Sequence, residues 1–200
     1  MALALAASVV VEPEAAEAVP ILPGVITCPV GTWTGTITFV PPLTTVAANF
    51  SPIETVKVNA HLKCAGTTGT LQKGHLTGKA TFTSPTGVTE NDCNTIIPAA
   101  VGGANPWVPA TTPTWKIVWT APVGVPTKFK FTTITVNHLA GNLVDFAIAN
   151  TAATGSFPAG FAGNETLTGP GGWSYAAWTA ACATAVGLGS ASLTGSSGSW

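Results

Sequence analysis

The chain is poor in ionisable side chains and contains no arginine. Its 200 residues include seven lysines, eight acids and three histidines. These side-chain types perform most proton transfer, metal ligation and phosphate binding in proteins, and here they stand singly along the chain. The sequence therefore predicts no catalytic, cofactor-binding or metal-binding centre. Because the formal net charge is −1 and the sequence shows no basic stripe, it also argues against nucleic-acid binding.

The first residues are typical of an export signal. Residues 2–11 are apolar, and Ala16-Glu17-Ala18 fits the small-x-small rule for signal peptidase, with cleavage before Val19. No lysine precedes the apolar stretch, so an upstream start and an Ala-rich tail are the alternatives. We predict a signal-peptide-like segment at 1–18, an extended leader at 19–27 and one domain at 28–200. The protein is then expected to be secreted or held at the cell surface.

Period-two alternation of apolar and polar residues predicts an antiparallel sheet with one buried and one wetted face. It is clearest in residues 31–39, 56–64 and 75–82. Further strands are predicted at 114–119, 128–138, 143–149 and 188–194, with a bulge near Thr132 and Thr133, where the apolar phase slips. Gly and Pro turn signals separate these runs, and the strand pattern faintly repeats, as two facing meanders would. The sequence predicts an all-β fold, an antiparallel β-sandwich or flattened barrel of about 7–10 strands.

Residues 174–184 are the one helical candidate, with Ser174 as its N-cap. Residues 166–200 carry no charge, which raises the question of a membrane span. They are rich in Ser, Thr, Gly and Ala where a span requires Leu, Ile, Val and Phe, and no lysine flanks them. We predict a short surface helix that leads into a final strand, and no membrane span.

Four cysteines in an exported chain predict two disulfides, with three pairings open. No C-x-x-C pair is present, which argues against zinc binding and thioredoxin-like redox chemistry. If successive strands alternate in direction, Cys28 and Cys64 meet at one end of the sheet. Cys93 then leaves the other end and would join Cys182.

Several segments together resemble a known kind of protein. They are G-T-W-T-G-T-I-T-F-V-P-P-L after Cys28, T-V-K-V-N-A-H-L-K-C-A-G around Cys64, Asn91-Asp92-Cys93, and Ala181-Cys182 before a Gly/Ser-rich strand. This layout resembles the small secreted β-proteins common in actinobacteria, most of them described only as hypothetical exported proteins. The resemblance covers about residues 28–193. It implies export, two disulfides and an all-β domain, and it implies no catalytic residue.

The histidines and acids form no recognisable catalytic pattern. No G-x-S-x-G motif is present, although a nucleophilic site would need a Ser or Cys together with His and a carboxylate. We predict His61, His75 and His138 on wetted strand faces, with His61 and His75 as neighbours across a hairpin. Of the acids beyond the leader, Asp145 is predicted to lie mid-strand and to face solvent opposite a lysine; the others lie in or beside turns: Glu54, Glu90, Asp92 and Glu165. The run Glu90-Asn91-Asp92 is similar to a loose calcium loop but lacks its alternating ligands.

Seven tryptophans are the most distinctive feature that is present. Three of them, Trp33, Trp115 and Trp119, lie in predicted strands and are expected in the core. Trp107, Trp173 and Trp178 lie in predicted loops or in the helix candidate. Exposed tryptophan binds sugar rings or anchors a protein interface, so these three are the predicted binding surface. The alternative is that they cap the ends of the fold.

Together these features favour a non-catalytic secreted or cell-envelope protein with a structural, adhesive or interaction role. Its partner would be a cell-wall glycan or another envelope or secreted protein. One alternative is a subunit of a secreted or envelope oligomeric assembly, a pore-forming one included, with the uncharged C-terminal residues as its interface. The other alternative is a small secreted hydrolase.

Overall fold

The computed structural model describes residues 26–66, 71–83, 90–121, 127–131, 133–154 and 162–200, so the predicted signal-peptide-like segment lies outside the described residues. The described chain is dominated by one sheet of 13 strands. The first seven are β1 (Ile26–Cys28), β2 (Trp33–Leu43), β3 (Ile53–Gly66), β4 (Leu71–Thr83), β5 (Ala104–Trp107), β6 (Thr114–Ala121) and β7 (Thr127–Lys130). The others are β8 (Ile134–Leu139), β9 (Leu143–Thr154), β10 (Ala162–Leu167), β11 (Trp173–Ser174), β12 (Leu188–Ser192) and β13 (Ser197–Ser199). Short helices are η1 (Ala47–Asn49), α1 (Cys93–Ile96) and α2 (Tyr175–Cys182).

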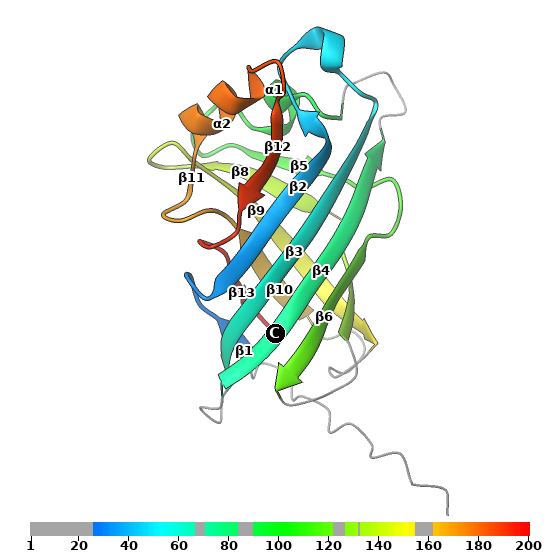
Figure 1. Cartoon of the computed structure of the whole chain (residues 1–200), viewed down its shortest axis with the longest axis vertical. Helices are drawn as coiled ribbons and strands as arrows, with labels where there is room; N and C mark the ends of the chain where they lie inside the picture. Colours follow the sequence, from blue (N-terminus) through cyan, green and yellow to red (C-terminus); the bar gives the residue numbers. More distant parts are fainter. Residues whose placement is uncertain (1–25, 67–70, 84–89, 122–126, 132, 155–161) are drawn as a thin grey trace, which may run out of the picture.

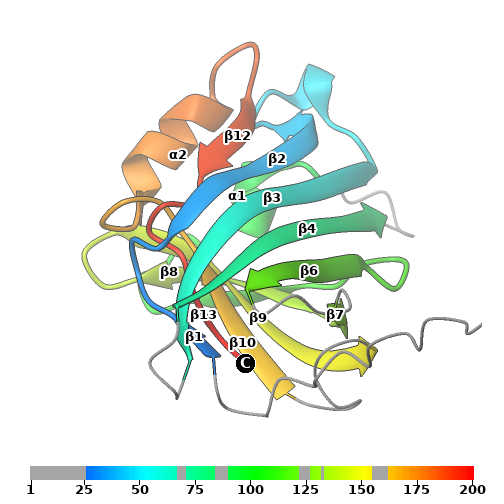
Figure 2. The same ribbon diagram turned by 60° about the horizontal axis from the view of Figure 1, so that its bottom comes forward.

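Eight of these strands close into an antiparallel barrel in the order β3, β4, β6, β7, β9, β10, β13 and β1. The strand β1 closes the wall because it pairs on both sides, with Thr27 opposite Ser199 of β13 and opposite Ala65 of β3. Figure 2 shows the wall curving from β3 through β4 and β6, with β9 and β10 forming the opposite wall of the barrel. Of the two predicted architectures the barrel is the one found. The idea of two separate facing meanders was wrong, because these closing pairs join them into a single sheet.

The remaining strands widen the wall at one end of the barrel. The strands β2 and β1 share the same edge of β3, and β12 pairs with β2 beyond it. In the same way β8 and β7 share one edge of β9, and β5 pairs with β8. In Figure 1, α2 lies beside β12 at this end. These added strands make the sheet wider at one end of the barrel.

The barrel interior is filled by aromatic rings that pack on glycines. An eight-stranded barrel is just wide enough for side chains to fill it. The ring of Trp115 occupies the space that a Cβ atom at Gly78 would take, and Trp200 fills the corresponding space at Gly163. Trp33 and Trp119 lie against Trp200, with ring centroids 6.3 Å and 6.1 Å away. Tryptophan opposite glycine is thus how this sequence reaches close packing between neighbouring strands.

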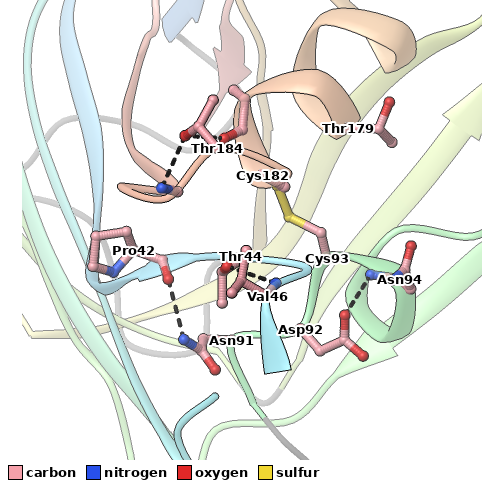
Figure 3. Close-up of a disulfide and its surroundings, with 12 residues drawn as sticks. Pro42, Thr44, Val46, Asn91, Asp92, Cys93, Asn94, Thr179, Cys182 and Thr184 are labelled. Atoms are coloured by element: carbon pink, nitrogen blue, oxygen red, sulfur yellow. Dashed lines mark hydrogen bonds between the residues drawn. A yellow bond between two sulfur atoms is a disulfide. The ribbon is translucent and has the colours of Figure 1, made fainter. Parts of the chain in front are cut away.

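The helix α2 and a disulfide hold the widened end together. The Ser174 hydroxyl accepts a hydrogen bond from the Ala177 amide, as predicted for the N-cap. Trp178 of α2 packs edge-on against Phe39 and Phe146 of the wall. Both predicted disulfide pairings are confirmed, Cys28 with Cys64 and Cys93 with Cys182. Figure 3 shows the second bridge joining α1 to the end of α2.

The strand predictions are largely confirmed, with five omissions. The predicted strand at 128–138 is two strands, β7 and β8, and the buried phase passes from Phe129 and Phe131 to Ile134. The predicted bulge falls on Thr132, which lies outside the described residues. The omitted strands β1, β5, β10, β11 and β13 are short, with 3, 4, 6, 2 and 3 residues. So few residues offer little alternation to detect. Because β1 includes Ile26 and Thr27, the folded domain begins before Cys28 and the predicted leader is too long.

Candidate functional site

The predicted tryptophan surface was wrong. Trp107, Trp173 and Trp178 are only 6%, 7% and 4% exposed. Trp107 stacks on Phe82 with ring centroids 3.9 Å apart, and its indole N–H donates to the Glu90 carboxylate. Trp173 packs on Trp178, with ring centroids 4.8 Å apart. The alternative holds for these rings, because they cover the widened end of the fold and no flat ring is presented to a ligand.

The three histidines have different surroundings. His61 and His75 are neighbours across the β3–β4 hairpin, as predicted, with their rings stacked 4.6 Å apart. His75 Nε2 donates to Oδ1 of Asn59 at 2.7 Å. His138 is buried, which contradicts its predicted wetted position, because its ring stacks on Tyr175 at 4.1 Å and its Nδ1 is 2.9 Å from the Pro98 carbonyl oxygen. None of these contacts is with a carboxylate.

One carboxyl group lies inside the barrel. Glu165 of β10 is 2% exposed and accepts hydrogen bonds from Trp115 Nε1 at 2.9 Å and from Asn150 Nδ2 at 3.2 Å. Burial raises the pKa of Glu165 to about 8, against the smaller opposing effect of these two donors. The group is held mainly as the neutral acid at neutral pH. Sequence analysis placed Glu165 beside a turn, because β10 was not predicted.

The other acids are also engaged within the fold. Glu54 is fully buried, accepts from the Val40 amide at 2.8 Å and has a pKa raised to about 8, chiefly by burial. Asp145 accepts from Asn137 Nδ2 at 2.7 Å, so its predicted partner was wrong: the residue opposite it is Asn137 and not a lysine. Asp92 caps α1 by accepting from the Asn94 amide, as Figure 3 shows. Among the described residues, no three His, Cys, Asp or Glu side chains are grouped so that they could hold a metal ion.

The lysines, in contrast, all lie together on one surface. All seven belong to four neighbouring strands of the barrel wall, β3, β4, β6 and β7, and all are exposed: Lys57, Lys63, Lys73, Lys79, Lys116, Lys128 and Lys130. The same four strands contain a single acid, the buried Glu54. We call the outer surface of these strands, with its seven lysines, the lysine face. In Figure 1 the strands β3, β4 and β6 run side by side across the front. The absence of a basic stripe from the sequence was therefore misleading.

The register of the strands places like charges directly opposite one another. Three lysine pairs are aligned in this way, Lys57 with Lys79, Lys63 with Lys73, and Lys116 with Lys128. The stacked pair His61 and His75 lies on the same β3–β4 hairpin. Like charges in directly opposed positions destabilise a sheet. The pKa of His75 is lowered by partial burial and, to a smaller extent, by His61 and Lys116, as expected on a positive surface.

A pocket of about 570 Å³ has four of these lysines in its lining. They are Lys79, Lys116, Lys128 and Lys130, and the lining also includes Thr77 and Thr114 and the apolar residues Pro113, Trp115 and Phe129. Lysine stems are apolar and their ammonium groups remain in water. Such a site can hold anionic groups through ammonium ions and offer hydroxyls for hydrogen bonds. Alternation along the chain predicts exposed positions for Lys57, Lys63 and Lys79. All seven lysines come to lie on one surface only because β4 pairs with β6 and β6 pairs with β7.

Comparison with known proteins yields no relative. The chain matches no family model, and no significant match is found among curated proteins or among solved structures. Within the part of the chain that the structure describes, no helix has the length and apolar character to cross a bilayer.

Proposed function

We propose that this chain is a non-catalytic exported protein that acts at the cell envelope or outside the cell and binds anionic ligands through the lysine face. The observation that carries the proposal is the gathering of all seven lysines on four adjacent strands whose one acid is buried. Two disulfides support an oxidising location. The proposal keeps the adhesive or interaction role favoured by the sequence and replaces stacking on tryptophan with electrostatic attraction.

The charge distribution supports attraction of anions in spite of a formal net charge of −1. That value includes three acids in residues 1–25, outside the described structure. Glu54 and Glu165 are held mainly neutral at pH 7 by burial. Glu54 is the one acid on the four strands of the lysine face, so no largely ionised acid lies among the seven lysines on these strands. A concentrated positive field speeds the encounter with anions.

The direct test is binding to a labelled sulfated dextran, with uncharged dextran as the reference polymer. We expect binding to the sulfated polymer only, weakening steeply with salt because the contacting charges are exposed. The variant Lys116→Gln/Lys128→Gln removes one opposed pair, and we expect about tenfold weaker binding, with each lysine contributing about 0.7 kcal/mol.

A matched control separates the position of the charge from its amount. The variant Asn94→Asp/Asn142→Asp also lowers the net charge by two, at exposed positions on α1 and in the turn between β8 and β9, neither of them on a strand of the lysine face. It should bind the sulfated polymer nearly as well as the native chain. Equal loss in both double variants would contradict a localised site.

A further inference from the structure

We infer that the natural occupant of the lysine face is an extended anionic polysaccharide, laid across strands β3, β4, β6 and β7. This inference rests on the proposed function and specifies the chemistry of the partner. It depends on the extent of the charged surface and on the uncharged polar groups between the lysines. It also depends on the scarcity of the exposed aromatic and apolar side chains that nucleic acids and membranes would contact.

The size of the lysine face fits a chain better than a small anion. Lys57 and Lys63 are separated along β3 by about 20 Å, at about 3.4 Å per residue. The strands β3 and β7 are three strand spacings apart, about 15 Å. A single phosphate or carboxylate reaches only one or two ammonium groups at a time. A linear polymer with a charge on each repeat can meet several of the opposed lysine pairs at once.

Uncharged polar side chains lie among the lysines on the same surface. Asn59 and Thr77 stand opposite each other in the β3–β4 pairing, and Thr77 stands opposite Lys116. Thr114 is opposite Lys79 in the β4–β6 pairing, and both line the 570 Å³ pocket. Hydroxyl and amide groups of this kind pair with sugar hydroxyls. A polymer that carries both charges and hydroxyls can donate to and accept from these side chains, whereas a bare polyphosphate only accepts.

Two other polyanions fit less well. Single-stranded nucleic acids are held without sequence preference by stacking their bases on aromatic side chains, and every tryptophan of the chain is 7% exposed or less. Anionic membranes bind proteins through charge together with inserted apolar side chains. Among the described residues of the four strands of the lysine face, only one large hydrophobic side chain is exposed. It belongs to Ile53, the first residue of β3. The observations thus favour a hydrated glycan chain.

The experiment is a titration of the full-length protein with oligogalacturonates, from the disaccharide to chains longer than the face, followed by fluorescence anisotropy. We expect affinity to rise at least tenfold as the chain lengthens to about 20 Å, and little thereafter. Inorganic polyphosphate and a single-stranded oligodeoxythymidylate of matched charge, and phosphatidylglycerol vesicles, are the competing probes. Each is expected to bind several-fold more weakly than the long oligogalacturonate.

Two variants assign the contacts. Lys116→Gln/Lys128→Gln should bind the long oligogalacturonate about tenfold more weakly and with a smaller salt dependence. Thr114→Val keeps a β-branched side chain of the same shape and removes only the hydroxyl. It should lower affinity for the oligogalacturonate about threefold while the salt dependence stays unchanged. The control variant Asn94→Asp/Asn142→Asp should match the native chain with every probe.

The outcomes separate this inference from the proposed function. If the protein binds sulfated dextran but shows equal affinity for the disaccharide and the long chain, the extended occupant is wrong and the anion-binding function stands. Equal or tighter binding of polyphosphate, of the oligodeoxythymidylate or of the vesicles overturns the polysaccharide assignment in the same way. If sulfated dextran is not bound either, the proposed function itself fails.

Discussion

Ionisable side chains have opposite surroundings on the outer wall and in the interior of this barrel: they are exposed to water on the wall and buried inside. On the lysine face, three pairs of lysines stand directly opposite each other in water. Inside, Glu165 stands alone between Trp115 and Asn150, and burial keeps it mainly neutral at pH 7. Water screens the repulsion between exposed ammonium groups, whereas the hydrogen bonds from Trp115 and Asn150 replace only part of the hydration that the Glu165 carboxylate loses on burial. Burial thus removes most of the negative charge of Glu165 at pH 7, whereas all seven lysines of the outer wall are exposed.

The interior is expected to make stability depend strongly on pH. In the folded state the pKa values of Glu54 and Glu165 are raised from 4.5 to about 8. Between these values the native state binds more protons than the unfolded state, so stability is highest below about pH 4.5 and falls as the pH rises toward 8. We expect a loss on the order of a few kcal/mol, measured by urea unfolding at several pH values.

The variant Glu165→Gln sharpens this test, because an amide oxygen still accepts from the indole N–H but the side chain cannot ionise. Its free energy of unfolding should decline less between pH 4.5 and 8 than that of the native chain, with the remaining decline due to Glu54. A native chain that gains stability over this range would contradict the account of the interior.

Removing one donor from the buried carboxyl group is the next largest change. Trp115→Phe deletes the N–H that reaches Glu165, and we expect it to cost about 1–3 kcal/mol in unfolding free energy at acidic pH. The pKa of Glu165 should rise further, so the pH-dependent decline should end at a higher pH. Trp33→Phe is the matched control, because within the described structure the buried Trp33 indole N–H makes no hydrogen bond. It should leave the pH dependence unchanged.

Reversing one charge on the lysine face should improve stability while it impairs binding. Lys116→Glu replaces the repulsion between Lys116 and Lys128 with an opposite-charge pair. We expect about 0.2–1 kcal/mol of added stability and weaker binding of sulfated dextran than in the glutamine variant. Unfolding and binding are measured on the same samples. A loss of stability would indicate that the aligned lysines do not repel one another.

The smallest expected effect is on the titration of His75. Its pKa is lowered by partial burial, by His61 and by Lys116. Lys116→Gln should move the pKa upward toward the ordinary value, and saturation with a bound polyanion should do the same. Proton NMR of the His75 ring over pH 4 to 9 measures this shift. Lys130→Gln serves as the control, since Lys130 is not among the groups that shift His75, and its pKa should stay in place.

Local sequence patterns predicted much of the fold and little of the site. Period-two alternation located β2, β3, β4, β6 and β9, the phase slip located the break between β7 and β8, and strand direction gave both disulfides. The site was missed for two reasons. Trp173 and Trp178 were assigned to the surface by their place near the helix candidate, but they pack against each other and against Phe146. The lysines were judged to be dispersed because they are separated along the chain.

By itself, the sequence determined the strand type, the positions of most strands and the wetted side on which Lys57, Lys63 and Lys79 lie, because alternation is a local property of the backbone. Only the tertiary structure decided that the sheet closes through β1, that Glu165 is enclosed, and that Lys116 and Lys128 stand beside Lys79. Those outcomes depend on which strands pair and in what register, and pairing energies arise between residues that are far apart in the chain.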